Sequence, residues 1–191
     1  GVKIGPSPSW LQQRLSLCDI RSVNNVVDVT NLVLLECGHP MHAFDYDTIT
    51  DNKIIVKRAC AGEGFTTLDD KTHTLTDDDL LICDGKRPIA LAGVMGGQNS
   101  EVQEATTNVL LEAAYFLPTM IRRTSKRHGI ISDSSKRFER GCDPNMILYA
   151  LDRAAQLIKE LTGGTIASGF VDVAVGTFSP HSVTCRYTRI N

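Results

Sequence analysis

Hydrophobic and polar positions follow two different periods along this chain, and the change of period separates helical from extended segments. In four places apolar residues return every three or four positions, which is typical of helices with one buried face. The predicted helices cover residues 8–18, 22–37, 118–128 and 144–162. Ser22 is a suitable N-cap for the second helix. Glycines that can take the left-handed C′ conformation follow three of the helices, at positions 38, 129 and 163.

Between residues 54 and 116 the apolar positions alternate, as they do in strands with one buried face. Asp84-Gly85 is a strong signal for a tight hairpin turn. The predicted strands cover residues 54–59, 65–68, 72–75, 80–83, 88–92 and 108–116, with one more at 165–175. These elements predict an α+β fold, with a mixed, mainly antiparallel β core and about four helices packed around it. We assign residues 1–175 to this domain and residues 176–191 to a linker and the start of a next module.

One carboxylate lies in the most apolar of these strands. In the segment 108–116, Glu112 has apolar neighbours on both faces of the predicted strand. Two apolar faces are typical of a central strand that is buried on both sides. An unpaired charge in such a place costs several kcal/mol, so the carboxylate is expected either to form a structural ion pair or to meet a ligand. The pattern alone leaves both interpretations open.

The charge is nearly balanced overall but unevenly distributed. A net charge of −2 argues against a protein that binds nucleic acid over its whole surface. Seven of the 20 Lys and Arg residues nevertheless lie between positions 122 and 140: Arg122, Arg123, Lys126, Arg127, Lys136, Arg137 and Arg140. Residues 130–142 are predicted to form a polar, basic loop. The segment either faces an anion or is a solvated surface with structural arginines.

The remaining composition argues against several classes of protein. The closest cysteines, Cys18 and Cys37, are 19 positions apart, so a zinc ribbon or thioredoxin-type pair is not expected. Reduced thiols are typical of a cytoplasmic protein. No apolar run reaches the roughly 18 residues of a membrane span, and no secretory signal opens the chain. The aspartates at 77–79 indicate a polar turn, and no metal site is predicted. The uncapped ends of the chain, without an initiator Met, predict a fragment of a longer polypeptide.

Five sequence blocks carry a resemblance to a known family. They are NVVDVTN (25–31), PMHAFD (40–45), PIALAGVMGG (88–97), VLLEAA (109–114) and SKRFERGCDP (135–144). In this order and at this spacing the blocks closely resemble the central editing module of the β subunit of bacterial phenylalanyl-tRNA synthetase. The resemblance extends over roughly residues 5–175. It is much more specific than any one block, because five blocks agree in order.

The resemblance implies hydrolysis of mischarged Tyr-tRNA(Phe), within an enzyme that attaches phenylalanine to tRNA(Phe) using ATP. An apolar pocket rejects the extra hydroxyl of tyrosine only weakly, by a factor of about 10². A second site can discriminate better if it requires that hydroxyl. Glu112 matches the family's tyrosine-hydroxyl contact, so bound phenylalanine would leave the carboxylate unpaired at a cost of about 1–3 kcal/mol.

The other site residues follow from the resemblance residue by residue. Gly93 and Gly96 match glycines that leave room for the aromatic ring and its hydroxyl, and Ser132 and Ser134 match a pair of residues that line the pocket. His42 and Asn31 match polar residues near the scissile ester and the terminal adenosine. The expected catalytic residues are His42, Asn31 and Ser132; the expected substrate-binding residues are Glu112, Gly93, Gly96 and Ser134; the expected tRNA-binding residues are Arg122, Arg123 and Lys126.

The sequence also gives an alternative for His42 and an expectation for a second histidine, His39. His42 could be a buried histidine that bonds to a backbone carbonyl, and His39 is expected to face solvent. No nucleophile elbow or Ser-His-Asp arrangement is evident, which favours direct attack on the ester by a positioned water.

The resemblance also implies partners. These are tRNA(Phe) with its mischarged aminoacyl ester and a catalytic α subunit in an α2β2 assembly, with no membrane. No cofactor is expected in this chain, and ATP and Mg are expected in the partner catalytic subunit. The alternative function is a module that positions tRNA and assembles subunits without hydrolytic activity. A third possibility is a free-standing proofreading enzyme or an unrelated hydrolase with this fold.

Overall fold

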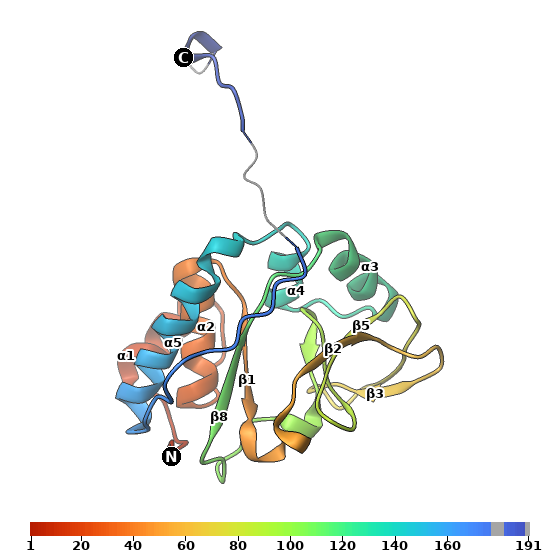
Figure 1. The fold of residues 1–191 in the computed structure, drawn as a ribbon. Helices are drawn as coiled ribbons and strands as arrows, with labels where there is room; N and C mark the ends of the chain where they lie inside the picture. Colours follow the sequence, from red (N-terminus) through yellow and green to blue (C-terminus); the bar gives the residue numbers. More distant parts are fainter. Residues whose placement is uncertain (177–181, 190–191) are drawn as a thin grey trace.

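Two strands that are far apart in the sequence pair at the centre of the molecule. The computed structural model describes residues 1–176 and 182–189 (Figure 1). In it, β1 (Met41–Asp45) and β8 (Val109–Ala113) form an antiparallel two-stranded sheet. Alternate side chains of this ladder face opposite sides. Ala43 and Leu111 pack into a core of helices, whereas Phe44 and Leu110 pack into a second core made mainly by strands. The ladder is therefore the wall that the two cores share.

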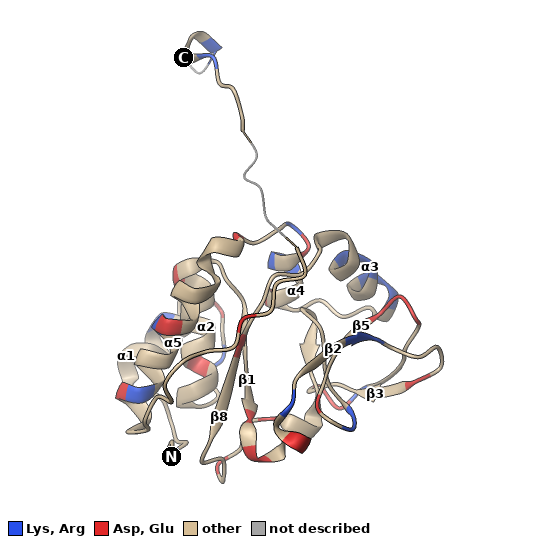
Figure 2. Cartoon of the chain, viewed as in Figure 1, with Lys and Arg blue, Asp and Glu red and all other residues tan. Residues whose placement is uncertain are grey.

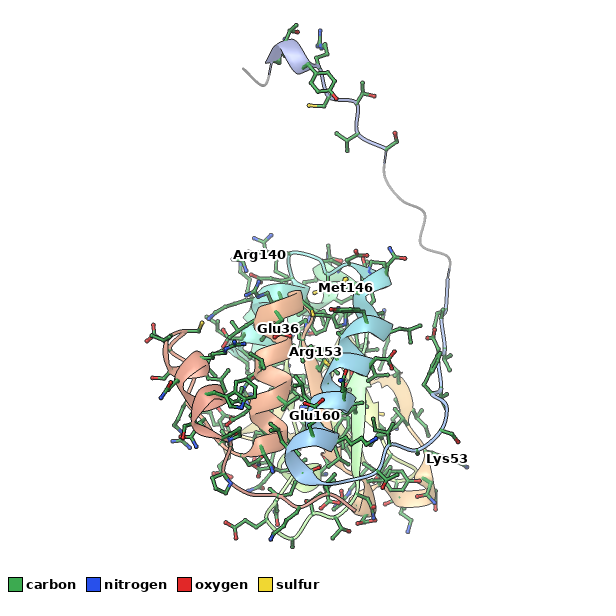
Figure 3. All side chains as sticks on the ribbon, turned by 90° about the vertical axis from the view of Figure 1, so that its left-hand side faces the viewer. Glu36, Lys53, Arg140, Met146, Arg153 and Glu160 are labelled. Atoms are coloured by element: carbon green, nitrogen blue, oxygen red, sulfur yellow. The ribbon has the colours of Figure 1, made fainter. Side chains whose placement is uncertain are left out.

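Three helices cover one face of the ladder, with α2 and α5 side by side (Figures 1 and 3). They are α1 (Ser9–Ser16), α2 (Asn25–Cys37) and α5 (Ile147–Thr162). An ion pair between Glu36 and Arg153, with 3.0 Å between Oε2 and Nε, joins α2 to α5 at their surface. Their apolar stripes meet inside, where Val29, Val33 and Ala154 are completely buried. The three periodic segments thus form one helical layer.

The N-terminus of α2 differs from the prediction in its capping residue. Asn24 caps the helix, because its Oδ1 accepts hydrogen bonds from the backbone N–H groups of Val26 and Val27. The hydroxyl of Ser22 instead donates to the carboxylate of Asp28, which is completely buried. At the other end Gly38 has φ +69°, as predicted for a C′ glycine.

The other face of the ladder is covered by strands and two further helices (Figure 1). A four-stranded sheet has the order β2-β5-β6-β7, and a separate hairpin pairs β3 with β4. The strands are β2 (Ile55–Arg58), β3 (Gly64–Thr66), β4 (Thr72–Thr74), β5 (Leu80–Cys83), β6 (Pro88–Leu91) and β7 (Met95–Gly96). The helices are α3 (Pro118–His128) and α4 (Asp133–Phe138). The predicted α+β fold is confirmed, and so are both hairpins.

Several local predictions were wrong. Residues 165–175 form no strand and are exposed throughout, because no neighbouring strand pairs with them. The basic segment 130–142 contains α4, which a capping box of Ser132 and Ser135 starts. β8 pairs with β1 alone, so it is not a central strand, and its residues are only half-buried. The helix predicted from 144 begins as a 3-10 turn, Pro144–Met146, before α5.

The division into a domain ending at 175 and a following linker stays a prediction. Residues 177–181 and 190–191 of that linker lie outside the described part of the chain.

The carboxylate of Asp79 is completely buried and joins α3 to the turn before β5. It accepts hydrogen bonds from the hydroxyls of Thr76 and Thr124 and lies 2.8 Å from Nε2 of His128, and Arg127 forms an ion pair with it. Burial raises the pKa of this carboxyl, but hydrogen bonds from Thr76, His128 and Thr124 outweigh it and hold the pKa below its usual value. The aspartates at 77–79 are therefore a polar turn with a structural anchor.

Replacing Asp79 by alanine should lower the free energy of unfolding by roughly 3–5 kcal/mol, because Arg127 and His128 would lose their buried partner. Since folding lowers the pKa of Asp79, its contribution is present above about pH 4 and is lost as the pH falls below that value. Urea denaturation at pH 7 and pH 3 measures both effects. Exposed Asp77 is the matched control, and alanine there should cost less than about 0.5 kcal/mol. An Asp79→Ala effect of the same size at both pH values would contradict this role.

Candidate functional site

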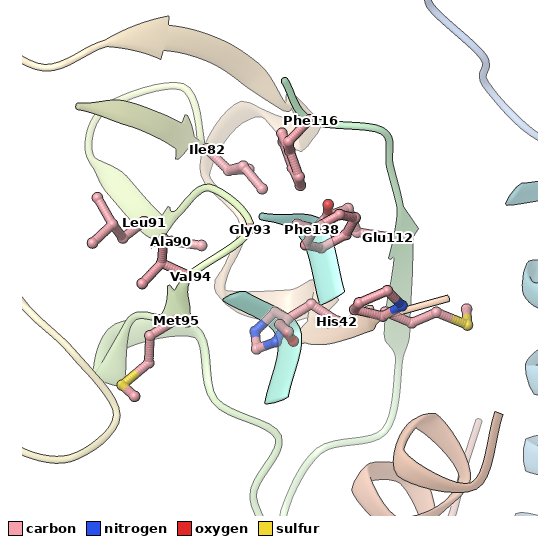
Figure 4. Close-up of a pocket in the computed structure, with 14 residues that line it drawn as sticks. His42, Ile82, Ala90, Leu91, Gly93, Val94, Met95, Glu112, Phe116 and Phe138 are labelled. Carbon is pink, nitrogen blue, oxygen red and sulfur yellow. The ribbon is translucent and has the colours of Figure 1, made fainter. Parts of the chain in front are cut away.

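A cavity of about 40 Å³ lies against the face of the β1–β8 ladder that looks toward the strand layer (Figure 4). β1 contributes His42 and β8 contributes Glu112, while the walls come from the β6–β7 loop, β7 and α4. The polar and glycine residues expected to converge do so here: His42, Glu112, Gly93, Gly96 and Ser134 all line the cavity. This convergence is the geometric part of the site prediction; the roles of the residues stay predictions.

Glu112 places a carboxyl group among apolar side chains. Figure 4 shows it close to the rings of Phe116 and Phe138, and Ile82 also lines the cavity. Burial raises the pKa of Glu112 to about 7. Within the described part of the chain, no hydrogen bond or ion pair engages its carboxyl group. The ion-pair interpretation therefore finds no support among these residues, and the carboxyl group is available to a ligand.

His42 lies directly opposite Glu112 in the ladder. Burial lowers the pKa of its imidazole to about 4, so the ring is neutral near pH 7. Its Nε2 is buried and has no hydrogen-bond partner among the described residues. The ring meets Phe44 edge to face, with 4.5 Å between centroids. The carbonyl partner considered from the sequence is not seen at Nε2, which packs against Gly96.

The two glycines shape the cavity by admitting side chains of the protein itself. A Cβ on Gly96 would lie 2.7 Å from Nε2 of His42. A Cβ on Gly93 would lie 2.7 Å from Cδ2 of Phe116, and Gly93 also has φ +68°, a conformation that other residues rarely adopt. Both distances are too short for a real side chain. The glycines thus allow Phe116 and His42 to pack closely against the backbone here. Their expected role of leaving room for the aromatic ring of a ligand stays a prediction.

The two serines have different positions. Ser134 lines the cavity, but Ser132 does not. The Ser132 hydroxyl donates to the carbonyl of Val94 at 2.6 Å and accepts from the N–H of Ser135 at 3.0 Å. Ser132 therefore starts α4 and ties it to the β6–β7 loop. It supports the cavity wall from behind, and its predicted catalytic role receives no geometric support.

Other predicted residues lie away from the cavity. Asn31 is half-buried on α2, on the helical side of the ladder, and is not among the cavity residues. Arg122, Arg123 and Lys126 are exposed on α3, near which α4 carries further basic residues (Figure 2). None of these three forms an ion pair with a described residue. Their charges are therefore free to meet an external anion.

His39 is completely buried, so the expectation that it faces solvent was wrong. Its ring packs edge to face against Phe138, with 6.2 Å between centroids. Burial lowers the pKa of this imidazole. The aromatic walls of the cavity, Phe116 and Phe138, were not predicted from the sequence. The available signal was the spacing of Ser134 and Phe138, which places both on one face of a helix once α4 is recognised.

Metal-binding and membrane-spanning features are not found in the described residues. No group of three or more His, Cys, Asp and Glu side chains among them is arranged to hold a metal ion. None of the described helices is both long enough and apolar enough to cross a membrane.

The geometry defines an α+β domain with a small apolar cavity and an unpaired carboxyl group, and sequence comparison assigns its family. The family model described as B3/4 domain matches residues 1–163, so the chain belongs to the B3/4 domain family. The chain is also similar to phenylalanine–tRNA ligase beta subunits. Identity is 55% with that of Geobacter metallireducens and 56% with that of Geobacter sulfurreducens, each over all 191 residues and 24% of the relative.

A third beta subunit, from Halalkalibacterium halodurans, is 57% identical over 171 residues, which are 90% of this chain and 21% of the relative. The chain spans about a quarter of the length of these curated relatives. The resemblance identified from the five sequence blocks is confirmed: the chain corresponds to one segment of such a subunit.

Replacing Glu112 by glutamine should stabilise the protein at alkaline pH. A carboxyl group with a pKa of about 7 in the folded state and 4.5 in the unfolded state favours folding when it is protonated. Its contribution is therefore complete below pH 4.5 and is lost as the pH rises through about 7. Glutamine keeps the shape without the charge, so the variant should exceed the wild type by roughly 2–3 kcal/mol at pH 8.5 and by much less at pH 4.5.

Chemical denaturation of both proteins at the two pH values measures this difference. Glu104→Gln is the control, because Glu104 is exposed and its replacement should leave the pH dependence unchanged. A Glu112→Gln variant that tracks the wild type at both pH values would show that the carboxyl group is well solvated.

Proposed function

We propose that the chain is an editing module that hydrolyses the ester of mischarged Tyr-tRNA(Phe), acting within a cytoplasmic phenylalanine–tRNA ligase. The observation that carries the proposal is the unpaired carboxyl group of Glu112 in an apolar cavity. Phenylalanine and tyrosine differ by one hydroxyl. A buried acceptor that lacks a hydrogen-bond donor binds the ligand with this hydroxyl more tightly than the ligand without it. The name shared by the similar subunits supports this choice of amino acids.

In this proposal Glu112 in its ionised form accepts a hydrogen bond from the phenolic hydroxyl of tyrosine. The aromatic ring packs against Phe116 and Phe138, whose own rings meet edge to face with 5.0 Å between centroids. The cavity of about 40 Å³ holds only a few water molecules, so side chains must move to admit the ring. Met41 and Met95 line the cavity, and their unbranched side chains can adopt new rotamers at little cost.

His42 positions the attacking water. Its pKa of about 4 makes it a weak base at neutral pH, so orientation through Nε2 suits it better than proton abstraction. The water oxygen attacks the ester carbonyl carbon, and the bond from that carbon to the ribose oxygen breaks. The proton released by the water goes to the ribose oxygen, with the neighbouring ribose hydroxyl assisting. The products are free tyrosine and uncharged tRNA.

The basic face of α3 supplies the contact with the tRNA backbone. Arg122, Arg123 and Lys126 are exposed, and α3 follows directly after Phe116 of the cavity. These exposed cations attract the phosphates of the tRNA and steer it toward the module. A catalytic α subunit, in an α2β2 assembly, would bind ATP and Mg and form the aminoacyl-tRNA ester on which this module acts.

Replacing Glu112 by alanine should lower kcat/KM for Tyr-tRNA(Phe) roughly 10- to 150-fold, because one buried hydrogen bond to a charged group is worth about 1.5–3 kcal/mol. Hydrolysis of Phe-tRNA(Phe) should be unchanged or slightly faster, since the penalty of an unpaired carboxylate disappears. Deacylation of both esters by wild-type protein, Glu112→Ala and the exposed control Glu104→Ala measures the ratio. Circular dichroism must first show that the variants are folded.

The ratio of the two rates should also rise with pH through about 7 in the wild type, where Glu112 ionises, and be flat in Glu112→Gln. Using the ratio cancels the intrinsic alkaline hydrolysis of esters. An equal decrease in rate on both esters would make Glu112 structural. Wild-type protein that binds tRNA but hydrolyses neither ester would support the alternative, a tRNA-positioning and subunit-assembly module.

Substituting the free cations of α3 should reduce the salt dependence of tRNA binding. Each of Arg122→Ala, Arg123→Ala and Lys126→Ala should lower the slope of log K against log salt by about one unit for each phosphate that the side chain neutralises. Lys136 already pairs with Asp133 at 3.2 Å, so Lys136→Ala is the matched control and should change the slope less. Filter binding over a range of salt concentrations gives these slopes. Unchanged slopes for all three variants would show that these side chains are a solvated surface and contact no phosphate of the tRNA.

A further inference from the structure

One edge of β8 has no partner strand. In the β1–β8 ladder the N–H of Tyr46 donates to the carbonyl of Asn108, so the even-numbered residues of β8 are the ones that bond to β1. Successive residues of a strand direct their backbone groups to opposite edges. Val109, Leu111 and Ala113 therefore direct their N–H and C=O groups away from β1, and we call this row of groups the outer edge of β8.

The backbone groups of the outer edge are unused. Among the described residues, no hydrogen bond from another segment reaches the N–H or C=O groups of Val109, Leu111 and Ala113, and β8 pairs with β1 alone. The residues of β8 are only half-buried. Three donors and three acceptors thus lie in a row at the spacing of a strand. An edge of this kind is a template for an added strand.

A segment of the same chain passes this edge without pairing. Residues 170–175, Phe-Val-Asp-Val-Ala-Val, follow α5, and Figure 1 shows the dark blue chain after α5 crossing in front of β8. Phe170 is 62% exposed and Val171 is 93% exposed, so the segment packs against almost nothing. Within the described part of the chain it forms no hydrogen bond. The segment is therefore close to the outer edge and uncommitted.

The residue pattern of this segment is that of a strand. Valine, which favours strands, occupies every second position from 171 to 175. Two features that the sequence predicts and the structure does not show, a central position for β8 and a strand within residues 165–175, agree with each other. A strand added at the outer edge of β8 would fulfil both.

The connection between β8 and the segment also suits parallel strands. A Cβ on Gly164 would lie 2.8 Å from Val2, whose N–H donates to the carbonyl of Thr107, so the chain leaves α5 beside the start of β8. From there it runs in the same direction as β8 (Figure 1). Figure 3, in which α5 faces the viewer, shows this part of the chain to the right of the ladder. A strand in that place completes a right-handed crossover through α5, the hand of about 98% of parallel connections.

We infer that segment 170–175 pairs with the outer edge of β8 as a third, parallel strand, in exchange with the unpaired arrangement of Figure 1. Gly169, directly before the segment, has φ +82°, so the backbone there can turn in ways that other residues rarely allow. The tether through α5 keeps the segment at a high effective concentration, which favours it over a strand from a second molecule. The pairing would hold the strand that carries Glu112 at both of its edges.

Amide hydrogen exchange of the 191-residue protein, followed by two-dimensional NMR, tests this pairing. The amides of Val109, Leu111 and Ala113 should exchange roughly tenfold or more slowly in the wild type than in a variant with both Val171→Pro and Ala174→Pro. Proline has no N–H and is excluded from the interior of a sheet. One substituted position is odd and the other even, so the variant loses a donor to β8 in either register.

Two controls separate the pairing from the stability of the domain. Val183→Pro, at an exposed position beyond the segment, should leave the exchange of the outer-edge amides unchanged. The amides of Leu110 and Glu112, which face β1, should exchange slowly in all three proteins, because the β1–β8 ladder does not depend on the segment.

Equal exchange of the outer-edge amides in the wild type and the double-proline variant would overturn the inference. Protection that increases with protein concentration would also overturn it, since a second molecule would then supply the strand. None of residues 170–175 lines the Glu112 cavity, so either result leaves the editing proposal untouched.

Discussion

In the β1–β8 ladder His42 lies opposite Glu112, and the next pair joins Ala43 to Leu111. Because side chains alternate across a strand, a shift of one residue would turn Glu112 into the helical core and Leu111 into the cavity. The charge would then be buried without a ligand, at a cost of several kcal/mol. This register fixes which core receives each side chain. It also closes a long loop that holds the whole strand layer, so the cavity exists only once the ladder has formed.

The electrostatics of the cavity follow from that arrangement. Burial raises the pKa of Glu112 and lowers that of His42, so each group is driven toward its neutral form although the two are cross-strand neighbours. Neither shift has a contribution from the opposite charge of the other group. The two groups therefore form no ion pair with each other, and the carboxyl group of Glu112 stays without a partner among the described residues. In the proposed function, selectivity for tyrosine depends on this carboxyl group, which has no partner among the described residues.

Periodicity predicted most of the fold, since the helices and hairpins depend on local patterns of burial. Periodicity failed where a neighbouring strand determines whether a segment becomes a strand. Residues 41–45 form a strand only because β8 lies beside them, and residues 165–175 alternate correctly but have no neighbour to pair with. The short α4 has little apolar periodicity and is started by a serine capping box. The candidate site came from the resemblance. Its geometry then separated Ser134, at the cavity, from Ser132, which acts behind it.

Two adjacent glycines, Gly96 in β7 and Gly97 directly after it, allow rings from two other strands to pack closely against this segment. Gly96 admits the imidazole of His42, and a Cβ there would meet it at 2.7 Å from Nε2. A Cβ on Gly97 would lie 2.8 Å from Cζ of Phe65, the buried residue between Gly64 and Thr66. Successive residues of a strand face opposite sides, so each glycine receives a ring from its own side. A larger residue at position 96 would push away the ring of His42, and one at position 97 would push away the ring of Phe65.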